Sequence, residues 1–152
     1  ATDVMAAIGE SLESPGVFRS IAARAEAIAI TELGRIQALG TQGRQVQASR
    51  LVAGLKKAWA HGDVRRQSRQ NHYLRWPAGV NGQIRDADAA FDIPGGSDGA
   101  EQGMFPRDPG LSAGNSVNCR CQSVPWHEDW SEDPQYVELV QRAFPGWASR
   151  EP

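Results

Sequence analysis

Apolar residues recur at helical spacing in the first third of the chain. Ile21, Ala25 and Ile28 are followed by Leu33 and Ile36. Side chains at this spacing lie on one face of a helix, so the charged residues between them can remain in water. Those charged residues are Arg24, Glu26, Glu32 and Arg35. The pattern predicts a long amphipathic helix.

Single residues indicate where this helix begins and whether it continues. Ser14 before Pro15 is typical of an N-cap followed by proline at the first helical position, where the missing N–H costs nothing. Gly40 and Gly43 each cost about 1 kcal/mol relative to alanine, which a long helix tolerates. We therefore expect helical structure over residues 14–52, passing through both glycines.

The residue pattern over positions 53–125 predicts a small sheet with long loops. The stretch from Leu55 to Trp59 fits both the face of a helix and alternate positions of a strand, so its periodicity leaves both open. Glycine and proline recur from Pro94 to Gly114, which predicts a long irregular loop.

The stretch Val117–Val124 alternates between two kinds of side chain and predicts a strand. One face carries Val117, Cys119 and Cys121, and the other carries Asn118, Arg120 and Gln122. Two cysteines at this spacing close a disulfide only with strain, so we expect free thiols.

The segment 126–152 combines aromatic and acidic residues. Its apolar spacing predicts a short helix after Pro134. Aromatic side chains in such number indicate docking, onto the same chain or onto a partner. They are Trp126, Trp130, Tyr136, Phe144 and Trp147. We treat this segment as an aromatic tail that follows a domain over residues 1–125.

Composition and charge limit the chain to one compact domain. A length of 152 residues with 40% hydrophobic content can bury one modest core. The expected fold is α+β, with a long N-terminal helix packed on a small irregular antiparallel sheet with long loops. The net charge of −2 gives no overall attraction to nucleic acid or to an anionic membrane. No stretch approaches the roughly 18 apolar residues of a spanning helix, so we expect no membrane partner.

Several short motifs follow one another in a distinctive order. The most specific are Thr31-Glu32, the turn Pro106-Arg107-Asp108-Pro109 and the ending Asn118-Cys119-Arg120-Cys121. The positions between them that complete the order are Trp59, Asp63, Arg69, His72, Gly82, Gln83 and Phe91. In this order and with these gaps, the chain from about Ile21 to Pro125 resembles the Mu F-like head morphogenesis family of tailed bacteriophages.

The sequence departs from the usual family pattern in two places. The spacing from Asp63 to His72 is a few residues long, and Leu74-Arg75-Trp76 stands where Leu-Asp-Gly is usual. We therefore expect the middle of the domain to differ locally.

The resemblance implies a minor head protein that acts in head morphogenesis and in DNA packaging or ejection. Such proteins belong to the virion, at the portal vertex or in the capsid interior, and are assembled in the bacterial cytoplasm. The implied partners are the portal and major capsid proteins, with packaged DNA as a further contact. Members commonly carry an additional helical N-terminal region, so we expect one to precede this domain.

We expect the motif residues to form a structural polar cluster that fixes the loops on the helix. Arg120 is expected to pair with Glu32 or Asp108, with a binding contact as the alternative role. Pro106 and Pro109 suit a rigid turn. The expected cluster consists of Thr31, Glu32, Asp63, Arg69, His72, Asp108, Asn118 and Arg120.

His72, Cys119 and Cys121 are candidate metal ligands, with Asp63 or His61 as a fourth. Two thiolates and an imidazole suit tetrahedral zinc. Zinc sites more often contain Cys-x-x-Cys pairs, and small buried free cysteines are common. The sequence therefore favours no cofactor, and zinc is the alternative.

A basic segment interleaved with aromatic residues offers a DNA-contacting alternative. Its arginines are Arg65, Arg66, Arg69, Arg75 and Arg85. A solvated basic loop explains the same residues more simply.

Enzymatic function has little support in the sequence. It contains no glycine-rich phosphate loop, Gly-x-Ser-x-Gly elbow or His-Glu-x-x-His helix. The remaining candidates are His72 with Asp63, or Cys119 with a distant histidine. We expect no enzyme, and the alternative is a metal-dependent hydrolase or nuclease.

Overall fold

The computed structural model describes residues 20–62, 69–96 and 99–143, and its first element is the helix α2, Ile21–Ser49. The side chain of Ser20 caps the helix by accepting a hydrogen bond of 3.1 Å from the main-chain N–H of Ala23. The helix passes through both of its interior glycines, as predicted. The predicted start at Ser14 lies outside the described residues.

The face of α2 that packs on the rest of the chain is small and polar. Its buried residues are Ala27, Thr31, Ala38, Gln42 and Gln45. The apolar residues of the predicted amphipathic pattern instead face solvent, so α2 packs through the opposite face. The exposed large side chains of α2 are Ile21, Ile28, Leu33, Ile36 and Leu39. Small residues allow the body of the protein to approach the helix closely. The buried amides form hydrogen bonds across this contact: Gln42 donates to the Ala87 carbonyl at 2.7 Å, and Gln45 accepts from the Ser123 hydroxyl at 2.9 Å.

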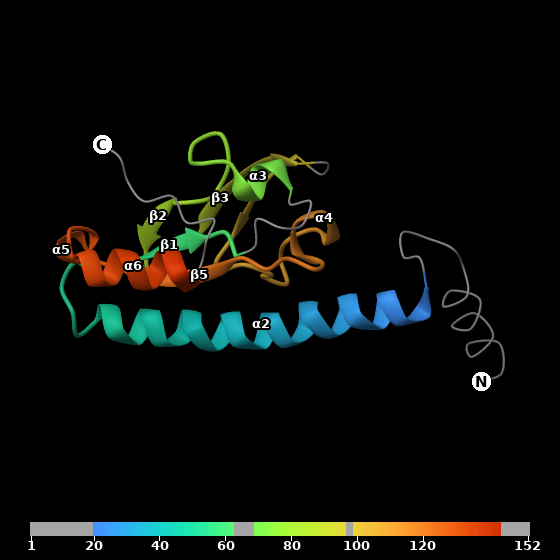
Figure 1. Cartoon of the computed structure of the whole chain (residues 1–152), viewed down its shortest axis with the longest axis horizontal. Coiled ribbons are helices and arrows are strands. Elements are labelled where there is room, and N and C mark those ends of the chain that lie inside the picture. Colours follow the sequence, from blue (N-terminus) through green and yellow to red (C-terminus); the bar gives the residue numbers. More distant parts are fainter. Residues whose placement is uncertain (1–19, 63–68, 97–98, 144–152) are drawn as a thin grey trace.

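A three-stranded antiparallel sheet lies along one side of α2 (Figure 1). The central strand is β1, Lys56–Ala60, which pairs with β2, Ile84–Asp86, and with β5, Gln122–Trp126. The ambiguous stretch around Trp59 is therefore a strand, because two neighbouring strands satisfy its backbone groups. Alternation along the chain could not reveal this, since four of its five residues are buried.

A hairpin and two short helices complete the body. The hairpin consists of β3, Phe91–Gly96, and β4, Gly99–Gly103. It occupies part of the stretch predicted as irregular loop, because backbone pairing does not require apolar side chains. The short helices are α3, Gln70–Tyr73, and α4, Ala113–Ser116.

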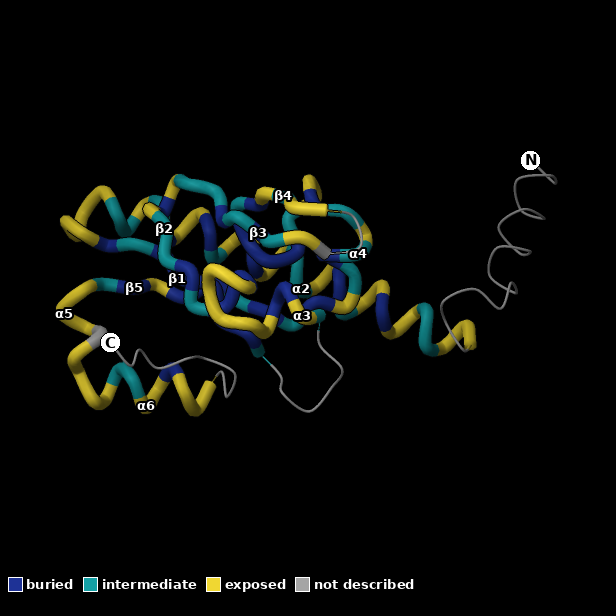
Figure 2. The backbone as a smooth tube through the Cα atoms, turned by 90° about the horizontal axis from the view of Figure 1, so that it is seen from above, coloured by how far each residue is buried: buried dark blue, intermediate teal, exposed yellow. Residues whose placement is uncertain are grey.

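The core lies between the two sheets, where the buried segments gather in Figure 2. Its main cluster consists of Trp59, Val80, Phe91, Ile93, Leu111, Cys119 and Cys121. The N-terminal part of α2 extends beyond this body in both views (Figures 1 and 2).

The prediction of a strand over Val117–Val124 was wrong in its first half. Asn118 has a φ of 54°, and the N–H of Cys119 donates to the Ser116 carbonyl at 3.3 Å, so this segment turns instead of extending. The strand begins only at Gln122, where β1 offers a pairing partner in Ala60. Both cysteines are nevertheless buried in the same cluster.

The aromatic tail packs partly onto its own chain. Trp126 is the last residue of β5 and is buried, so the sheet extends one residue past the expected boundary. The short helices α5, Glu128–Ser131, and α6, Pro134–Ala143, follow. The hydroxyl of Tyr136 donates to the Pro125 carbonyl. The predicted helix after Pro134 is confirmed, whereas Phe144 and Trp147 lie outside the described residues.

The predicted α+β class, with a long N-terminal helix on a small antiparallel sheet, is confirmed. Among the described helices, none combines the length and apolar character needed to span a bilayer.

Candidate functional site

His72, Cys119 and Cys121 lie together in the core and could hold a metal ion. His72 comes from α3, and the cysteines come from the segment between α4 and β5. The Nδ1 atom of His72 is 3.6 Å from the sulfur of Cys119 and 3.7 Å from that of Cys121. The edge of the Trp59 ring packs against the imidazole, with ring centroids 5.7 Å apart.

Two of the three distances within this group can be compared with those around a zinc ion. Zinc–sulfur and zinc–nitrogen bonds of about 2.3 and 2.05 Å at a tetrahedral angle place the sulfur and nitrogen about 3.6 Å apart. The two sulfur–nitrogen distances agree with this separation. The donor set and these two distances are therefore compatible with zinc, and the same distances also suit S–H···N hydrogen bonds.

Hydrogen bonds orient the His72 ring for this role. The side-chain oxygen of Asn115 lies 3.1 Å from His72 Nε2, and the amide nitrogen of Asn115 donates to Glu101 at 3.0 Å. Because that oxygen can only accept, Nε2 carries a proton, and Nδ1 is the ring nitrogen that faces the two sulfurs. Hydrogen bonds from Ser112 and Asn115 lower the pKa of Glu101 and keep it an acceptor at the end of this chain.

The two thiols have opposite pKa shifts. The pKa of Cys119 is well below its usual value, because the Cys121 thiol donates a hydrogen bond to its sulfur and His72 adds a second favourable contact. The pKa of Cys121 is well above its usual value, because this thiol holds the shared proton and is buried. Of the two thiols, Cys119 is therefore the more acidic.

The structure brings Thr31 of α2 to Asn118, as the predicted polar cluster requires. The Thr31 hydroxyl donates to the Ala27 carbonyl at 2.6 Å and accepts from the main-chain N–H of Asn118 at 2.8 Å. Arg69 donates to the Val117 carbonyl at 2.6 Å. Both bonds hold the cysteine-bearing segment against the rest of the chain.

Arg107 is the buried guanidinium of this region. It is 2% exposed, and its Nη1 donates to the main-chain carbonyl of Cys119. Its own carbonyl accepts from Arg35 Nε at 3.0 Å. Arg107 therefore joins α2 to the cysteine segment, a role predicted for Arg120.

The two carboxylates expected to pair with Arg120 have other partners. Glu32 accepts from Arg35 at 2.8 and 2.9 Å. Asp108 accepts from the main-chain N–H groups of Met104 and Gly110 at 2.7 and 2.9 Å and so braces its own turn. Asp63, the remaining residue of the predicted cluster, lies outside the described residues.

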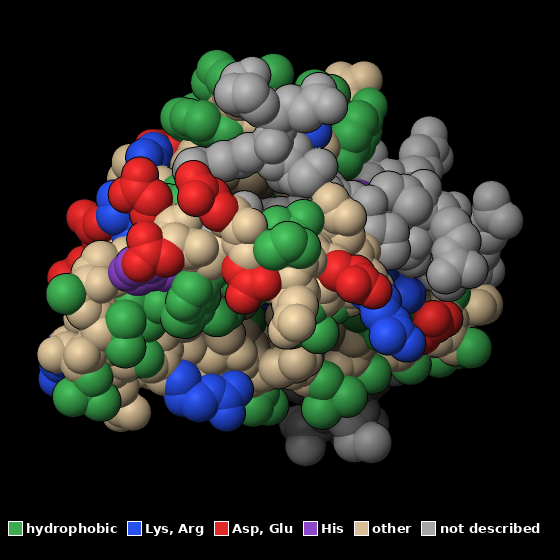
Figure 3. Space-filling view, turned by 60° about the vertical axis from the view of Figure 1, so that its left-hand side comes forward, with side chains coloured by type: hydrophobic (Ala, Val, Ile, Leu, Met, Phe, Trp, Pro, Cys, Tyr) green, Lys and Arg blue, Asp and Glu red, His purple; other side chains and the backbone are tan. Residues whose placement is uncertain are grey.

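The arginines considered for nucleic-acid contact are only partly described. Arg65 and Arg66 lie outside the described residues. Arg85 forms an ion pair with Asp92, and its guanidinium lies 5.4 Å from the centroid of the Trp76 ring. On the end of the molecule seen in Figure 3, acidic side chains are spread among hydrophobic ones and basic side chains stand apart from one another.

Sequence reasoning missed four residues of this region. Asn115 and Glu101 orient the histidine, and Gly34 lies directly beneath Arg107. Lys57 is fully buried on β1, where its ammonium donates to Gln42 and to the Met104 carbonyl. Their partners are distant in sequence, so local spacing gave no signal for them. Of the candidate fourth ligands, His61 is not part of the metal-ligand group.

Comparison with known proteins gives one curated relative. No protein-family model matches the sequence, and no solved structure matches it. The chain is 36% identical over 122 residues to a Bacillus subtilis (strain 168) protein described as the uncharacterized protein YqbB. The matched region covers 78% of this chain but only 36% of that protein, so the chain spans about a third of its relative.

Proposed function

We propose that this chain is the Mu F-like domain of a bacteriophage minor head protein, which contacts the portal and major capsid proteins during head morphogenesis and DNA packaging or ejection. One observation carries the proposal: residues of the three most specific motifs meet in space. Thr31 bonds to Asn118, and Arg107 bonds to Cys119. The first contact joins residues that are 87 positions apart in the sequence, and the second joins residues that are 12 positions apart. Such contacts explain why these motifs would occur together in one sequence.

The exposed apolar face of α2 supports a function by contact. Leu33 and Ile36 are each 69% exposed on a helix whose opposite face is buried. Large apolar side chains gathered on one exposed helix face mark interaction surfaces. The portal or major capsid protein is the occupant that this proposal assigns to the face.

We propose that His72, Cys119 and Cys121 bind zinc. The burial of these three ligands favours a structural role for the ion. All three ligands are at most 2% exposed, whereas a catalytic zinc keeps a position open to substrate. Bound zinc would tie α3 to the cysteine segment and so hold the loops that α2 contacts. A metal-dependent hydrolase or nuclease uses the same ligands and is the alternative.

The contact proposal is tested by placing a photoreactive amino acid at Ile36 during phage growth. The proposal predicts adducts with the portal or major capsid protein in purified particles. The matched position is Ala100 on β4, which is also exposed but lies away from α2, and which should give no such adduct. Equal labelling from both positions, or no adduct from Ile36, would contradict the assigned surface.

A further inference from the structure

A cavity of about 420 Å³ lies between α2 and the segment that leads into β5. Two arginines, Arg107 and Arg120, line it. Ile30 and Leu33 of α2 form an apolar wall, and Gln37 and Gln122 add amide groups. No aspartate or glutamate lines the cavity among the described residues.

The Arg107 guanidinium has one edge without a partner. Its Nη1 donates to the Cys119 carbonyl, but its buried Nε and Nη2 have no hydrogen-bond partner. Nε and Nη2 lie on the same edge of a guanidinium and point two parallel N–H groups at one acceptor. Such an edge matches the two oxygens of a carboxylate or phosphate.

Arg120 adds a second incomplete donor. Its Nε is also buried without a hydrogen-bond partner. Burying a guanidinium is costly, and burial lowers the pKa of Arg107 although the nearby Cys119 and Cys121 oppose this shift. An anion in the cavity would offset this cost for Arg107 and would give the Arg120 Nε an acceptor.

Two backbone features hold Arg107 in this position. Arg107 has a φ of 69°, a left-handed conformation that is unfavourable for a residue with a side chain. Gly34 lies beneath the guanidinium, and a Cβ atom there would be 2.5 Å from Arg107 Cζ. The left-handed backbone of Arg107 directs its side chain, and Gly34 leaves the space that the guanidinium occupies beside the cavity.

We propose that this cavity binds an oxyanion, a carboxylate or phosphate group held by the free edge of Arg107 and by Arg120. The amides of Gln37 and Gln122 can donate to its remaining oxygens, and the apolar wall suits the carbon part of an organic anion. The proposal assumes neither the virion function nor bound zinc, although Leu33 also belongs to the exposed face of α2 and Arg120 lies between the two cysteines.

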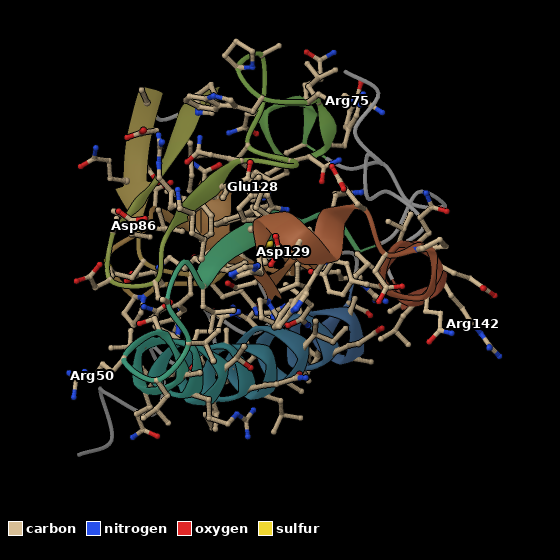
Figure 4. The ribbon with its side chains drawn as sticks, turned by 90° about the vertical axis from the view of Figure 1, so that its left-hand side faces the viewer. Arg50, Arg75, Asp86, Glu128, Asp129 and Arg142 are labelled. Carbon is tan, nitrogen blue, oxygen red and sulfur yellow. The ribbon has the colours of Figure 1, made fainter. Side chains whose placement is uncertain are left out.

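The test follows the side-chain Nε–H signals of the arginines by NMR in the whole chain. Inorganic phosphate and acetate are titrated separately, with sodium chloride keeping the ionic strength constant. The proposal predicts saturable shifts for Arg107 and Arg120. Arg50, at the end of α2, points away from the body in Figure 4 and should not respond.

Two variants make the result specific. Arg120→Gln should weaken anion binding about tenfold or more, because it removes a charged donor. Leu33→Glu changes an exposed residue at the cavity wall, so it should fold, and its carboxylate should compete with the added anion. Arg50→Gln should leave binding unchanged.

The two titrations also identify the ligand. If the shifts saturate at a lower concentration of phosphate than of acetate, the natural ligand carries a phosphoryl group. If acetate saturates first, the ligand carries a carboxylate. Shifts that stay linear for both ions, or that are equal in wild type and both cavity variants, overturn the proposal.

Discussion

Gly34 and Arg107 fit together only because Gly34 has no side chain. A Cβ atom at Gly34 would lie 2.5 Å from Arg107 Cζ and 2.6 Å from its Nε, closer than atoms in contact can approach. The guanidinium cannot move aside without leaving the Cys119 carbonyl. This contact joins the middle of α2 to the cysteine segment.

Gly34→Ala is therefore expected to destabilise the chain. Alanine gains about 1 kcal/mol in helix propensity, but overpacking a closely fitted contact costs about 1–3 kcal/mol or more. We expect a net loss of up to about 2 kcal/mol in the free energy of unfolding, measured by urea denaturation.

The matched control is Gly43→Ala in the same helix. A Cβ atom at Gly43 meets nothing within 4 Å, so this change should raise stability by up to about 1 kcal/mol. The two substitutions should thus have opposite signs. A stabilising effect of both would show that the guanidinium does not occupy the space above Gly34.

Thr31→Val tests the contact between the helix and the Asn118 turn. Valine keeps the shape of threonine but removes the oxygen that accepts from the Asn118 N–H. Loss of this bond should cost about 1–2 kcal/mol of unfolding free energy. Thr41→Val, at a half-buried position of the same helix, should change stability by less than about 0.5 kcal/mol. Equal effects would deny Thr31 a special role.

Zinc binding should depend on His72 and on the residue that orients it. Chain purified from cells supplied with zinc should contain about one zinc ion, by mass spectrometry of the metal. His72→Ala should lose it, and Asn115→Leu should bind zinc about 10- to 100-fold more weakly, because the imidazole loses its oriented partner. His127→Ala, a histidine outside the cluster, should retain the metal. Zinc at wild-type level in His72→Ala would exclude this site.

Burial of Lys57 should make stability depend on pH. Burial lowers its pKa from 10.5 to about 8, so the folded chain releases this proton earlier than the unfolded chain as the pH rises. The cost of burying the charge is fully present below about pH 8 and decreases between pH 8 and 10.5. Stability of the wild type should therefore rise through this range relative to Lys57→Met. A difference between the two proteins that does not vary from pH 7 to 10.5 would contradict the shifted pKa.

Features that depend on local spacing could be predicted from the sequence. The periodicity around Ile28 predicted α2, and the spacing after Pro134 predicted α6. Which face of α2 is buried could not be predicted in this way. The body packs on Ala27 and Ala38, so close approach outweighs the burial of larger apolar side chains.

The three candidate metal ligands could be predicted from the sequence, but the residues that surround and orient them could not. His72 and the two cysteines stood out by residue type. Asn115 lies 43 residues from His72, and only the folded chain brings them together. The role expected of Arg120 falls to Arg107, because the left-handed Asn118 ends the alternation on which the expectation for Arg120 depended.

The most direct test of the virion proposal is quantitative mass spectrometry of procapsids and mature particles purified from cells that produce the phage encoding this chain. The proposal predicts that the chain sediments with both kinds of particle, at a few copies per portal vertex, and remains bound after washing in high salt. A chain found only in the unassembled fraction would contradict the proposal.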